Sequence, residues 1–129
     1  MGFLSKLFEE KKKVQPVSVN DENFRQEVLE SELPVMLDVW GPSCAHCTRL
    51  EPIILRLAAK YEGKVKVAEM NAGSAPMTSG SLGVRGTPTV IYFKDGKIIE
   101  RVSGFRGELY HMEIIETEFL GHGDGEDQA

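Results

Sequence analysis

The sequence predicts an α/β fold in which a central mixed β-sheet is flanked by helices. Strand-like and helix-like segments alternate along most of the chain, in the order βαβαβαββα. Residues 35–40, VMLDVW, are apolar except for Asp38, which is typical of a strand that helices cover on both faces. Near the end of the chain, Asp95 and Gly96 join two strand-like segments, a strong signal for an antiparallel hairpin.

The first half of the chain should form two strands and two helices. Residues 17–19 are a short β-branched strand, and the helix after it starts with Asn20 as a plausible N-cap. After strand 35–40, a long helical pattern runs from about residue 44 to residue 61, and Pro52 should kink it. The expected apolar faces are Phe24, Val28 and Leu29 in the first helix and Leu50, Ile53, Ile54, Leu57 and Ala58 in the second.

The second half should add three strands and two helices. Residues 65–70 form a strand, and residues 75–82 form a short helix of weak propensity. Residues 89–93 and 98–102 are the antiparallel pair, and the last helix runs from about residue 108 to residue 120. The apolar stripe of this helix is expected at Leu109, Met112, Ile115 and Phe119.

Length and composition predict one globular domain. The 129 residues are 41% hydrophobic and 27% charged, which is close to globular averages. The net charge of −5 provides no basic surface for nucleic acid, so we expect no nucleic-acid partner. We divide the chain into an N-terminal extension at residues 1–13, a domain at residues 14–120 and an acidic, Gly-rich tail at residues 121–129, expected to be disordered.

The N-terminal extension places Phe3, Leu4, Leu7 and Phe8 on one stripe. This stripe could contact a membrane surface weakly or dock on the domain, and a frayed terminus is the alternative. The segment is too short to span a membrane, and no cleavage site for a secretory signal follows it, so we expect a cytoplasmic protein.

The only two cysteines, Cys44 and Cys47, are three positions apart where a buried strand ends and a helix begins. They lie on one side of the first helical turn, so they can form a disulfide. The positive end of the helix favours an anion at Cys44, which predicts an exposed, attacking Cys44 and a more buried, resolving Cys47. The alternative interpretation is a pair of small hydrophobic residues without chemistry.

Neither a metal nor another cofactor is expected at these cysteines. A structural zinc site needs four ligands, and only His46, His111 and His122 could add to the two thiols. Attachment of a c-type haem would need His directly after Cys47, where the chain has Thr48.

Asp38 is the one charged residue of its strand. An ionised carboxylate is costly in apolar surroundings unless it is paired, so the affinity of Asp38 for its proton should be raised. The alternative is a carboxylate turned outward at the end of the strand.

The chain resembles the thioredoxin family over about residues 14–120. The resemblance rests on VMLDVWGPSCAHC, Pro52 in the following helix, VKVAEMN, VRGTPTVIYFKDGK and a final helix after VSGF, all in thioredoxin order and near-thioredoxin spacing. It implies the thioredoxin fold and a reductase of protein disulfides, in which Cys44 attacks, a mixed disulfide forms and Cys47 resolves it. It also implies disulfide-containing protein substrates and a reductase as electron donor, and we expect a monomer.

The resemblance further implies roles for residues outside the cysteine motif. Thr87 and Pro88, with Gly86 before them, would form a cis-proline turn that faces the cysteines and pairs with a substrate strand. From the sequence alone, a trans proline at the start of a strand is the alternative. Asp38 would lie beneath Cys47 and take its proton, as an acid poised near neutrality can.

One departure from the family pattern affects the expected direction of electron flow. Ala45 and His46 replace the usual Gly-Pro pair, and an imidazole beside Cys44 would stabilise the thiolate and make the disulfide a better oxidant. An oxidant or isomerase of the same fold is therefore an alternative to the reductase. A non-enzymatic module that holds a partner in the groove near Pro88 is another.

Two further departures surround Asp38 and the motif. Glu69 replaces a Lys that neighbours the buried Asp in the family, and would raise the proton affinity of Asp38 further if the two approach. Ser43 replaces a Trp, which leaves Trp40 as the only indole and makes the docking surface smaller and more polar. We expect Trp40 to pack near the site with a supporting role.

Overall fold

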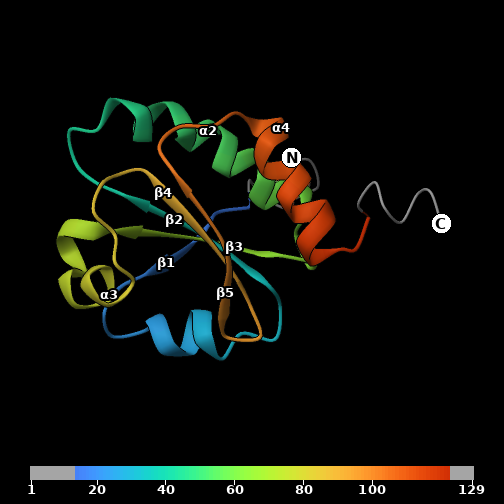
Figure 1. Ribbon diagram of the computed structural model, residues 1–129, viewed down its shortest axis with the longest axis horizontal. Helices are drawn as coiled ribbons and strands as arrows, with labels where there is room; N and C mark the ends of the chain where they lie inside the picture. The colour runs from blue at the N-terminus through green and yellow to red at the C-terminus, as the bar shows by residue number, and fades with distance from the viewer. Residues whose placement is uncertain (1–13, 123–129) are drawn as a thin grey trace, which may run out of the picture.

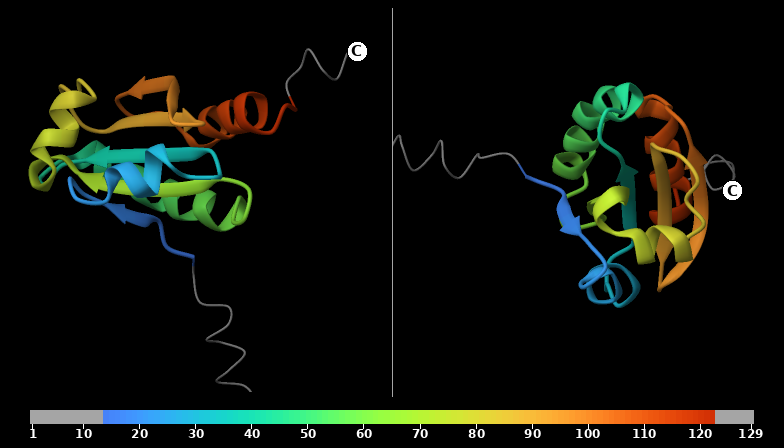
Figure 2. Two further views of the ribbon diagram at one scale, coloured as in Figure 1. Left: turned by 90° about the horizontal axis from the view of Figure 1, so that it is seen from below. Right: turned by 90° about the vertical axis from the view of Figure 1, so that its left-hand side faces the viewer.

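The computed structural model describes residues 14–122 and contains a five-stranded mixed sheet with helices on both faces (Figure 1). The strands are β1 (Val17–Val19), β2 (Val35–Trp40), β3 (Lys66–Asn71), β4 (Thr89–Lys94) and β5 (Lys97–Ser103). They lie in the order β1-β3-β2-β4-β5, which the left view of Figure 2 shows from bottom to top. Strand β3 is parallel to β1 and β2, whereas β4 is antiparallel to β2 and β5. The predicted fold class is confirmed.

The helical segments follow the predicted order with one addition. They are η1 (Arg25–Leu29), α2 (Ala45–Lys60), η2 (Ala72–Ser74), α3 (Pro76–Ser81), α4 (Glu108–Ile114) and η3 (Ile115–Phe119). The 3-10 turn η2 is the addition, and η3 continues α4 as a π-helical turn. Helix α2 continues through Pro52 without a break.

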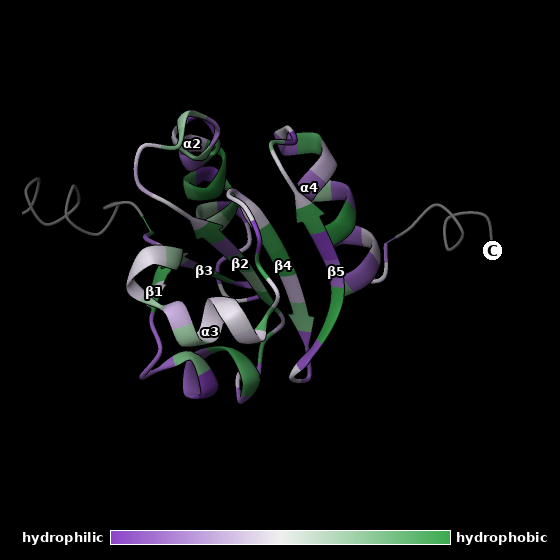
Figure 3. Ribbon diagram, turned by 60° about the vertical axis from the view of Figure 1, so that its left-hand side comes forward, coloured by the Kyte–Doolittle hydropathy of each residue, from purple (hydrophilic) through white to green (hydrophobic). Residues whose placement is uncertain are grey.

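Two apolar layers hold the helices against the sheet. One lies beneath α2 and α4 and contains every residue that the sequence places on the apolar face of α2. The other lies beneath η1 and α3, where Val28 is buried and Phe24 and Leu29 are partly buried. Figure 3 shows hydrophobic residues along the inner strand β4, whereas a hydrophilic stretch interrupts β5 at the sheet edge.

The hairpin between β4 and β5 has the predicted turn. Asp95 and Gly96 have φ angles of 53° and 78°, as the two central residues of a type I′ turn require. Lys94 and Lys97 are paired on either side of the turn. A glycine at the second turn position adopts this conformation without a steric penalty.

The final helix is rotated relative to the prediction. Ile115 and Phe119 are buried as expected, but Leu109 is 77% exposed, so its assignment to the apolar stripe is wrong. His111 takes the core position one turn before Ile115, and its ring Nδ1 is hydrogen-bonded to the Tyr92 hydroxyl. The hydrophobic pattern missed this because it counts histidine as polar and cannot see a partner in another strand.

Several predictions fall outside the described residues. The amphipathic extension at residues 1–13 lies there, as does the acidic tail apart from Gly121 and His122. The domain boundaries therefore stay a prediction. Within residues 14–122, no helix has both the length and the apolar character needed to cross a membrane.

Candidate redox site

Cys44 and Cys47 form a disulfide at the start of α2, with their Cα atoms 5.2 Å apart. Cys44 is the N-cap of the helix, and its Sγ accepts a hydrogen bond from the backbone N–H of Cys47 at 3.2 Å. Cys44 is partly exposed, whereas Cys47 is only 7% exposed. The positive end of the helix dipole lies beside Cys44, which favours a thiolate there after reduction.

The turn at Thr87 and Pro88 lies opposite the disulfide. The peptide bond between these residues is cis, and the Thr87 carbonyl oxygen is 3.5 Å from Cys44 Sγ. Pro88 is buried, and the Gly86 carbonyl accepts a hydrogen bond of 2.6 Å from the Thr89 hydroxyl. The turn that the resemblance implied is thus present and faces the more exposed cysteine.

Gly41 allows the segment before the cysteines to approach this turn closely. A Cβ atom at Gly41 would be 3.1 Å from Thr87 Oγ1, which is tighter than ordinary van der Waals contact. Ser43, two residues later, has a φ of 58°, which is uncommon for a residue with a side chain. The segment between β2 and α2 therefore bends sharply and lies against the turn that contains Pro88.

Asp38 is buried within β2, where it is only 5% exposed. Its Oδ1 atom has no hydrogen-bond partner among the described residues. Burial raises the pKa of the Asp38 carboxyl to about 7, and the nearby charges of Glu69 and Glu51 add to the rise. The direction agrees with the sequence prediction, and the contribution of Glu69 agrees with the effect expected from that departure.

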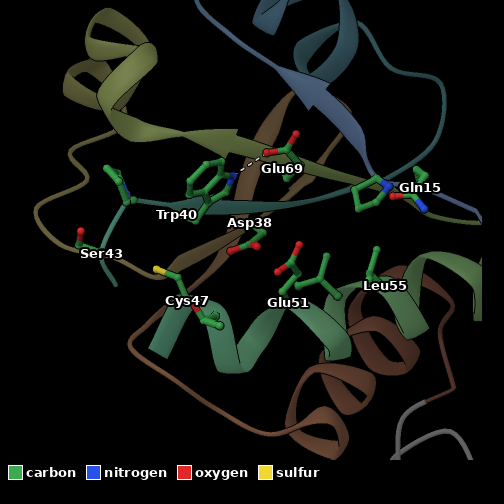
Figure 4. A pocket seen from close by; sticks show the side chains of 13 residues that line it. Gln15, Asp38, Trp40, Ser43, Cys47, Glu51, Leu55 and Glu69 are labelled. Atoms are coloured by element: carbon green, nitrogen blue, oxygen red, sulfur yellow. Dashed lines mark hydrogen bonds between the residues drawn. The ribbon is translucent and has the colours of Figure 1, made fainter. Parts of the chain in front are cut away.

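Asp38 and Cys47 line the same pocket, which has a volume of about 420 Å³ (Figure 4). Glu69 is the register partner of Asp38 on the neighbouring strand β3, so its side chain lies on the same face of the sheet. Glu51 enters the pocket from α2, one turn after Cys47. Glu51 was not among the predicted site residues, although its spacing of four residues from Cys47 is the signal that could have identified it.

Trp40 and Ser43 line the same pocket. The Trp40 indole N–H donates a hydrogen bond of 2.5 Å to Glu69 Oε1, and the ring is partly buried (Figure 4). Ser43 is exposed at the rim. Trp40 therefore packs beside the site, as expected, and also holds one carboxylate of the pocket.

The two residues between the cysteines, Ala45 and His46, are exposed. The His46 ring lies 6.3 Å from the Phe105 ring, and its Nδ1 is 3.5 Å from an Arg49 guanidinium nitrogen. The Arg49 guanidinium itself stacks over Phe105 at 4.2 Å. The effect of His46 on the Cys44 thiolate stays a prediction. In the part of the chain that the structure describes, no cluster of three His, Cys, Asp or Glu side chains could hold a metal ion.

Comparison with known proteins identifies the family. A family model described as thioredoxin matches residues 15–116. The thioredoxin of Synechocystis sp. is 41% identical over 86 residues, which cover 67% of this chain and 80% of the relative. The chloroplastic M-type thioredoxin of Spinacia oleracea is 41% identical over 99 residues, 77% of this chain and 54% of the relative.

A bacterial relative gives a similar result. The thioredoxin of Rickettsia conorii is 44% identical over 80 residues, which cover 62% of this chain and 76% of the relative. The family match at residues 15–116 extends over the segment with the two cysteines and the turn that faces them. The chain belongs to the thioredoxin family, whose members are protein-disulfide oxidoreductases.

Proposed function

We propose that this protein-disulfide reductase works by an attack from Cys44 followed by resolution through Cys47. The observation that carries the assignment is the difference between the two sulfurs. Cys44 is partly exposed, caps α2 and faces the Thr87 carbonyl, whereas Cys47 is buried one turn further into the helix. A substrate disulfide can therefore approach Cys44 more easily than Cys47.

The exchange balances as two substitutions at sulfur. The Cys44 thiolate attacks one sulfur of the substrate disulfide, forms a mixed disulfide and releases the first substrate thiolate. The Cys47 thiolate then attacks Cys44 Sγ, releases the second substrate thiolate and forms the Cys44–Cys47 disulfide. A separate reductase returns two electrons to this disulfide, and no bound cofactor takes part.

Asp38 is proposed to accept the proton of Cys47 in the second step. The two residues line one pocket, and Asp38 Oδ1 has no hydrogen-bond partner among residues 14–122. Because the pKa of Asp38 is raised to about 7, near neutral pH the carboxyl can both take up and release a proton. The acceptor is available above pH 7 and is progressively protonated as the pH falls through this value.

The groove beside Pro88 is proposed to hold the substrate chain next to Cys44. It has a volume of about 390 Å³, and its lining includes Gly86, Thr87 and Pro88. The Thr87 carbonyl oxygen lies 3.5 Å from Cys44 Sγ. A substrate backbone that is hydrogen-bonded to this segment would therefore bring its disulfide to the attacking sulfur.

Residues around the sulfurs are proposed to tune the reaction without taking part in it. Trp40 fixes the position of Glu69 through a hydrogen bond from its indole N–H. The charge of Glu69 in turn helps to raise the pKa of Asp38. Ala45 and His46 lie between the two cysteines in the sequence and are proposed to influence the stability of the Cys44 thiolate.

The finer assignments of assembly and location are part of the proposal. We propose that the protein is a monomer, and analytical ultracentrifugation tests it. We also propose a cytoplasmic location. Because the relatives include proteins named as chloroplastic, fractionation must compare cytoplasm with plastids where the source cell contains them.

A trapping experiment tests the order of attack. Cys47→Ser should accumulate stable mixed disulfides with substrate proteins, because the resolving thiol is missing, whereas Cys44→Ser should accumulate none. The adducts are counted by non-reducing electrophoresis and mass spectrometry. The assignment would be reversed if the Cys44→Ser variant formed adducts on Cys47 and the Cys47→Ser variant formed none on Cys44.

A further inference from the structure

The groove beside Pro88 is lined by two arginines and, among the described residues, by no acid. Arg85 lies in the segment between α3 and the cis peptide bond, whereas Arg101 lies on β5. Both residues are exposed. Two separate parts of the chain therefore bring a guanidinium to the same groove, and a guanidinium keeps its positive charge at any pH at which the protein folds.

A third arginine extends this positive surface toward the cysteines. Phe105 directly follows Gly104, a lining residue whose backbone N–H donates a hydrogen bond of 2.9 Å to the Pro88 carbonyl. The Arg49 guanidinium stacks over the Phe105 ring at 4.2 Å. One of its nitrogens is 3.5 Å from Nδ1 of His46, which lies between the two cysteines. Arg49 thus connects the end of the groove with the cysteine motif.

The charges of these three arginines are not neutralised by the described part of the chain. Two ion pairs occur among residues 14–122, and neither of them involves Arg49, Arg85 or Arg101. A carboxylate that arrives with a bound molecule could therefore pair with them.

Two of the three guanidiniums are held in place before a substrate binds. Arg101 donates one N–H to the Leu82 carbonyl at 2.8 Å, and Arg49 is held by its stacking on Phe105. Each guanidinium has five N–H groups, so most of them stay available. A side chain that is already fixed loses less conformational entropy when it binds a ligand.

The described lysines lie away from this surface, and none of them lines the groove. The groove lies at the start of β4. The lysines lie at or just after the end of α2, at the start of β3 and on either side of the hairpin turn at the far end of β4: Lys60, Lys64, Lys66, Lys94 and Lys97. Positive charge at the groove therefore comes from guanidinium groups, whose planar fork matches the two oxygens of a carboxylate.

The other side of the disulfide has the opposite charge. The pocket that contains Cys47 is lined by Asp38, Glu51 and Glu69, and none of the described residues that line it is basic (Figure 4). An acidic segment is attracted to the groove and repelled from this pocket, whereas a basic segment experiences the reverse. The two sides together favour one orientation of an acidic segment at Cys44.

We propose that the groove selects substrate proteins in which acidic residues flank the reducible disulfide, and that Arg85, Arg101 and Arg49 bind the substrate carboxylates. This inference deepens the proposed function, because it rests on the role given there to the groove. The three arginines determine specificity: they bind the substrate chain and take no part in the exchange of sulfur bonds. Because these charges are exposed, salt weakens the selection.

The test compares three symmetric peptide disulfides that differ only in charge, with Glu, Gln or Lys on each side of the cysteine. The rate constant for oxidation of the reduced, full-length protein by each peptide is measured in acid-quenched samples by chromatography. Each value is divided by the rate constant of the same peptide with dithiothreitol, which corrects for the intrinsic reactivity of the disulfide.

The corrected rate constant should be about threefold to tenfold higher for the Glu peptide than for the Gln peptide, and lowest for the Lys peptide. This preference should disappear as the salt concentration rises from about 0.01 M to about 1 M, because the Debye length falls from about 30 Å to about 3 Å. If the Glu and Gln peptides have equal corrected rate constants at low salt, the proposal is wrong.

Variants of the groove locate the source of the preference. Arg85→Gln with Arg101→Gln should remove it, and Arg85→Gln alone, which leaves the hydrogen bond of Arg101 intact, should lower it about twofold. A change in the reactivity of Cys44 affects the Glu and Gln peptides alike, so it does not change their ratio. An unchanged ratio in both variants would contradict the proposal.

The matched control is Lys64→Gln with Lys97→Gln, which makes the same change of net charge at two exposed residues outside the groove. This control should keep the preference for the Glu peptide. If it loses the preference as fully as the double arginine variant does, the net charge of the protein is the cause and the groove is not.

Failure of this proposal can be distinguished from failure of the proposed function. Equal corrected rate constants for the Glu and Gln peptides would disprove the selection by charge and leave the reductase mechanism in place. If Cys44→Ser reduced the peptides as fast as the wild type does, the mechanism itself would be wrong.

Discussion

Asp38 and His111 are both buried ionisable residues, but their surroundings differ. Each has one atom without a hydrogen-bond partner among the described residues, Oδ1 of Asp38 and Nε2 of His111. Asp38 borders a pocket that it shares with Cys47. His111 is completely buried, with its ring stacked on Tyr92 and its Nδ1 hydrogen-bonded to the Tyr92 hydroxyl.

The same physical effect has different consequences at the two residues. Burial disfavours charge, so it raises the pKa of Asp38 to about 7 and lowers the pKa of His111 to about 4. At pH 7 His111 is therefore neutral and structural, whereas Asp38 is balanced between its two forms. A buried polar group becomes useful for proton transfer when its titration falls near the working pH and a reactive group shares its space.

The largest expected effect is on catalysis by Asp38. Asp38→Asn should slow disulfide reduction about tenfold or more at pH 8, because the acceptor for the Cys47 proton is lost. The wild-type rate should rise with pH through about 7, and the variant should lack this step. The measurement is the pH profile of single-turnover reduction of a protein disulfide. If the pH profile of Asp38→Asn is the same as that of the wild type, another group accepts the proton of Cys47.

The same variant should gain stability. The pKa of Asp38 is raised on folding, so its favourable contribution is present below about pH 4 and is lost as the pH rises through about 7. At pH 8, Asp38→Asn should therefore increase the free energy of unfolding by about 1 to 4 kcal/mol. Urea denaturation of the oxidised protein measures it. A marked loss of stability would mean that the carboxylate has a partner.

His111 should produce the opposite pH dependence. Its pKa is lowered on folding from 6.5 to about 4, so its contribution is present above pH 6.5 and is lost as the pH falls through about 4. In the Asp38→Asn background, the free energy of unfolding should fall by about 3 kcal/mol over this range. The double substitution His111→Leu with Tyr92→Phe removes both partners of the hydrogen bond. It should abolish the decrease in the free energy of unfolding that is caused by protonation of His111.

Urea midpoints at pH 4 and pH 7 compare the proteins. If the paired substitution leaves the pH dependence unchanged, protonation of His111 is not its cause. Tyr92→Phe alone is the matched control, because it removes the hydroxyl and leaves the imidazole in place.

The smallest expected effect is at His46, which is exposed. If its imidazole stabilises the Cys44 thiolate, His46→Ala should raise the pKa of Cys44 and lower the reduction potential by tens of millivolts, since about 30 mV corresponds to about 1.4 kcal/mol. Equilibration with a glutathione redox buffer measures the potential. An unchanged potential and thiolate titration would mean that contact with Arg49 and Phe105 keeps the ring away from the sulfur.

The parts of the fold that depend on local patterns were predictable from the sequence. The apolar face of α2 follows from helical periodicity, and the turn at Asp95 and Gly96 follows from residues that accept positive φ. The exposed Leu109 was not predictable in this way, because the rotation of α4 depends on a hydrogen bond between His111 and a distant strand.

The candidate site divides along the same line. The cysteine pair and the buried carboxyl of Asp38 are visible in a short motif and one apolar strand. The pocket is not, because it needs the register that places Glu69 beside Asp38 and the helix position that brings Glu51 to the same space. These contacts join three elements, and no periodicity within one element reveals them.

The missing side chain of Gly41 sets how widely the site opens. A methyl group at this position would press on the Thr87 hydroxyl at 3.1 Å, and the carbonyl of the same threonine lies 3.5 Å from Cys44 Sγ. Any outward shift of Thr87 would therefore be transmitted to the gap in front of the attacking sulfur. The aperture that admits a substrate disulfide is thus controlled by a residue that has no reactive atom and touches no substrate.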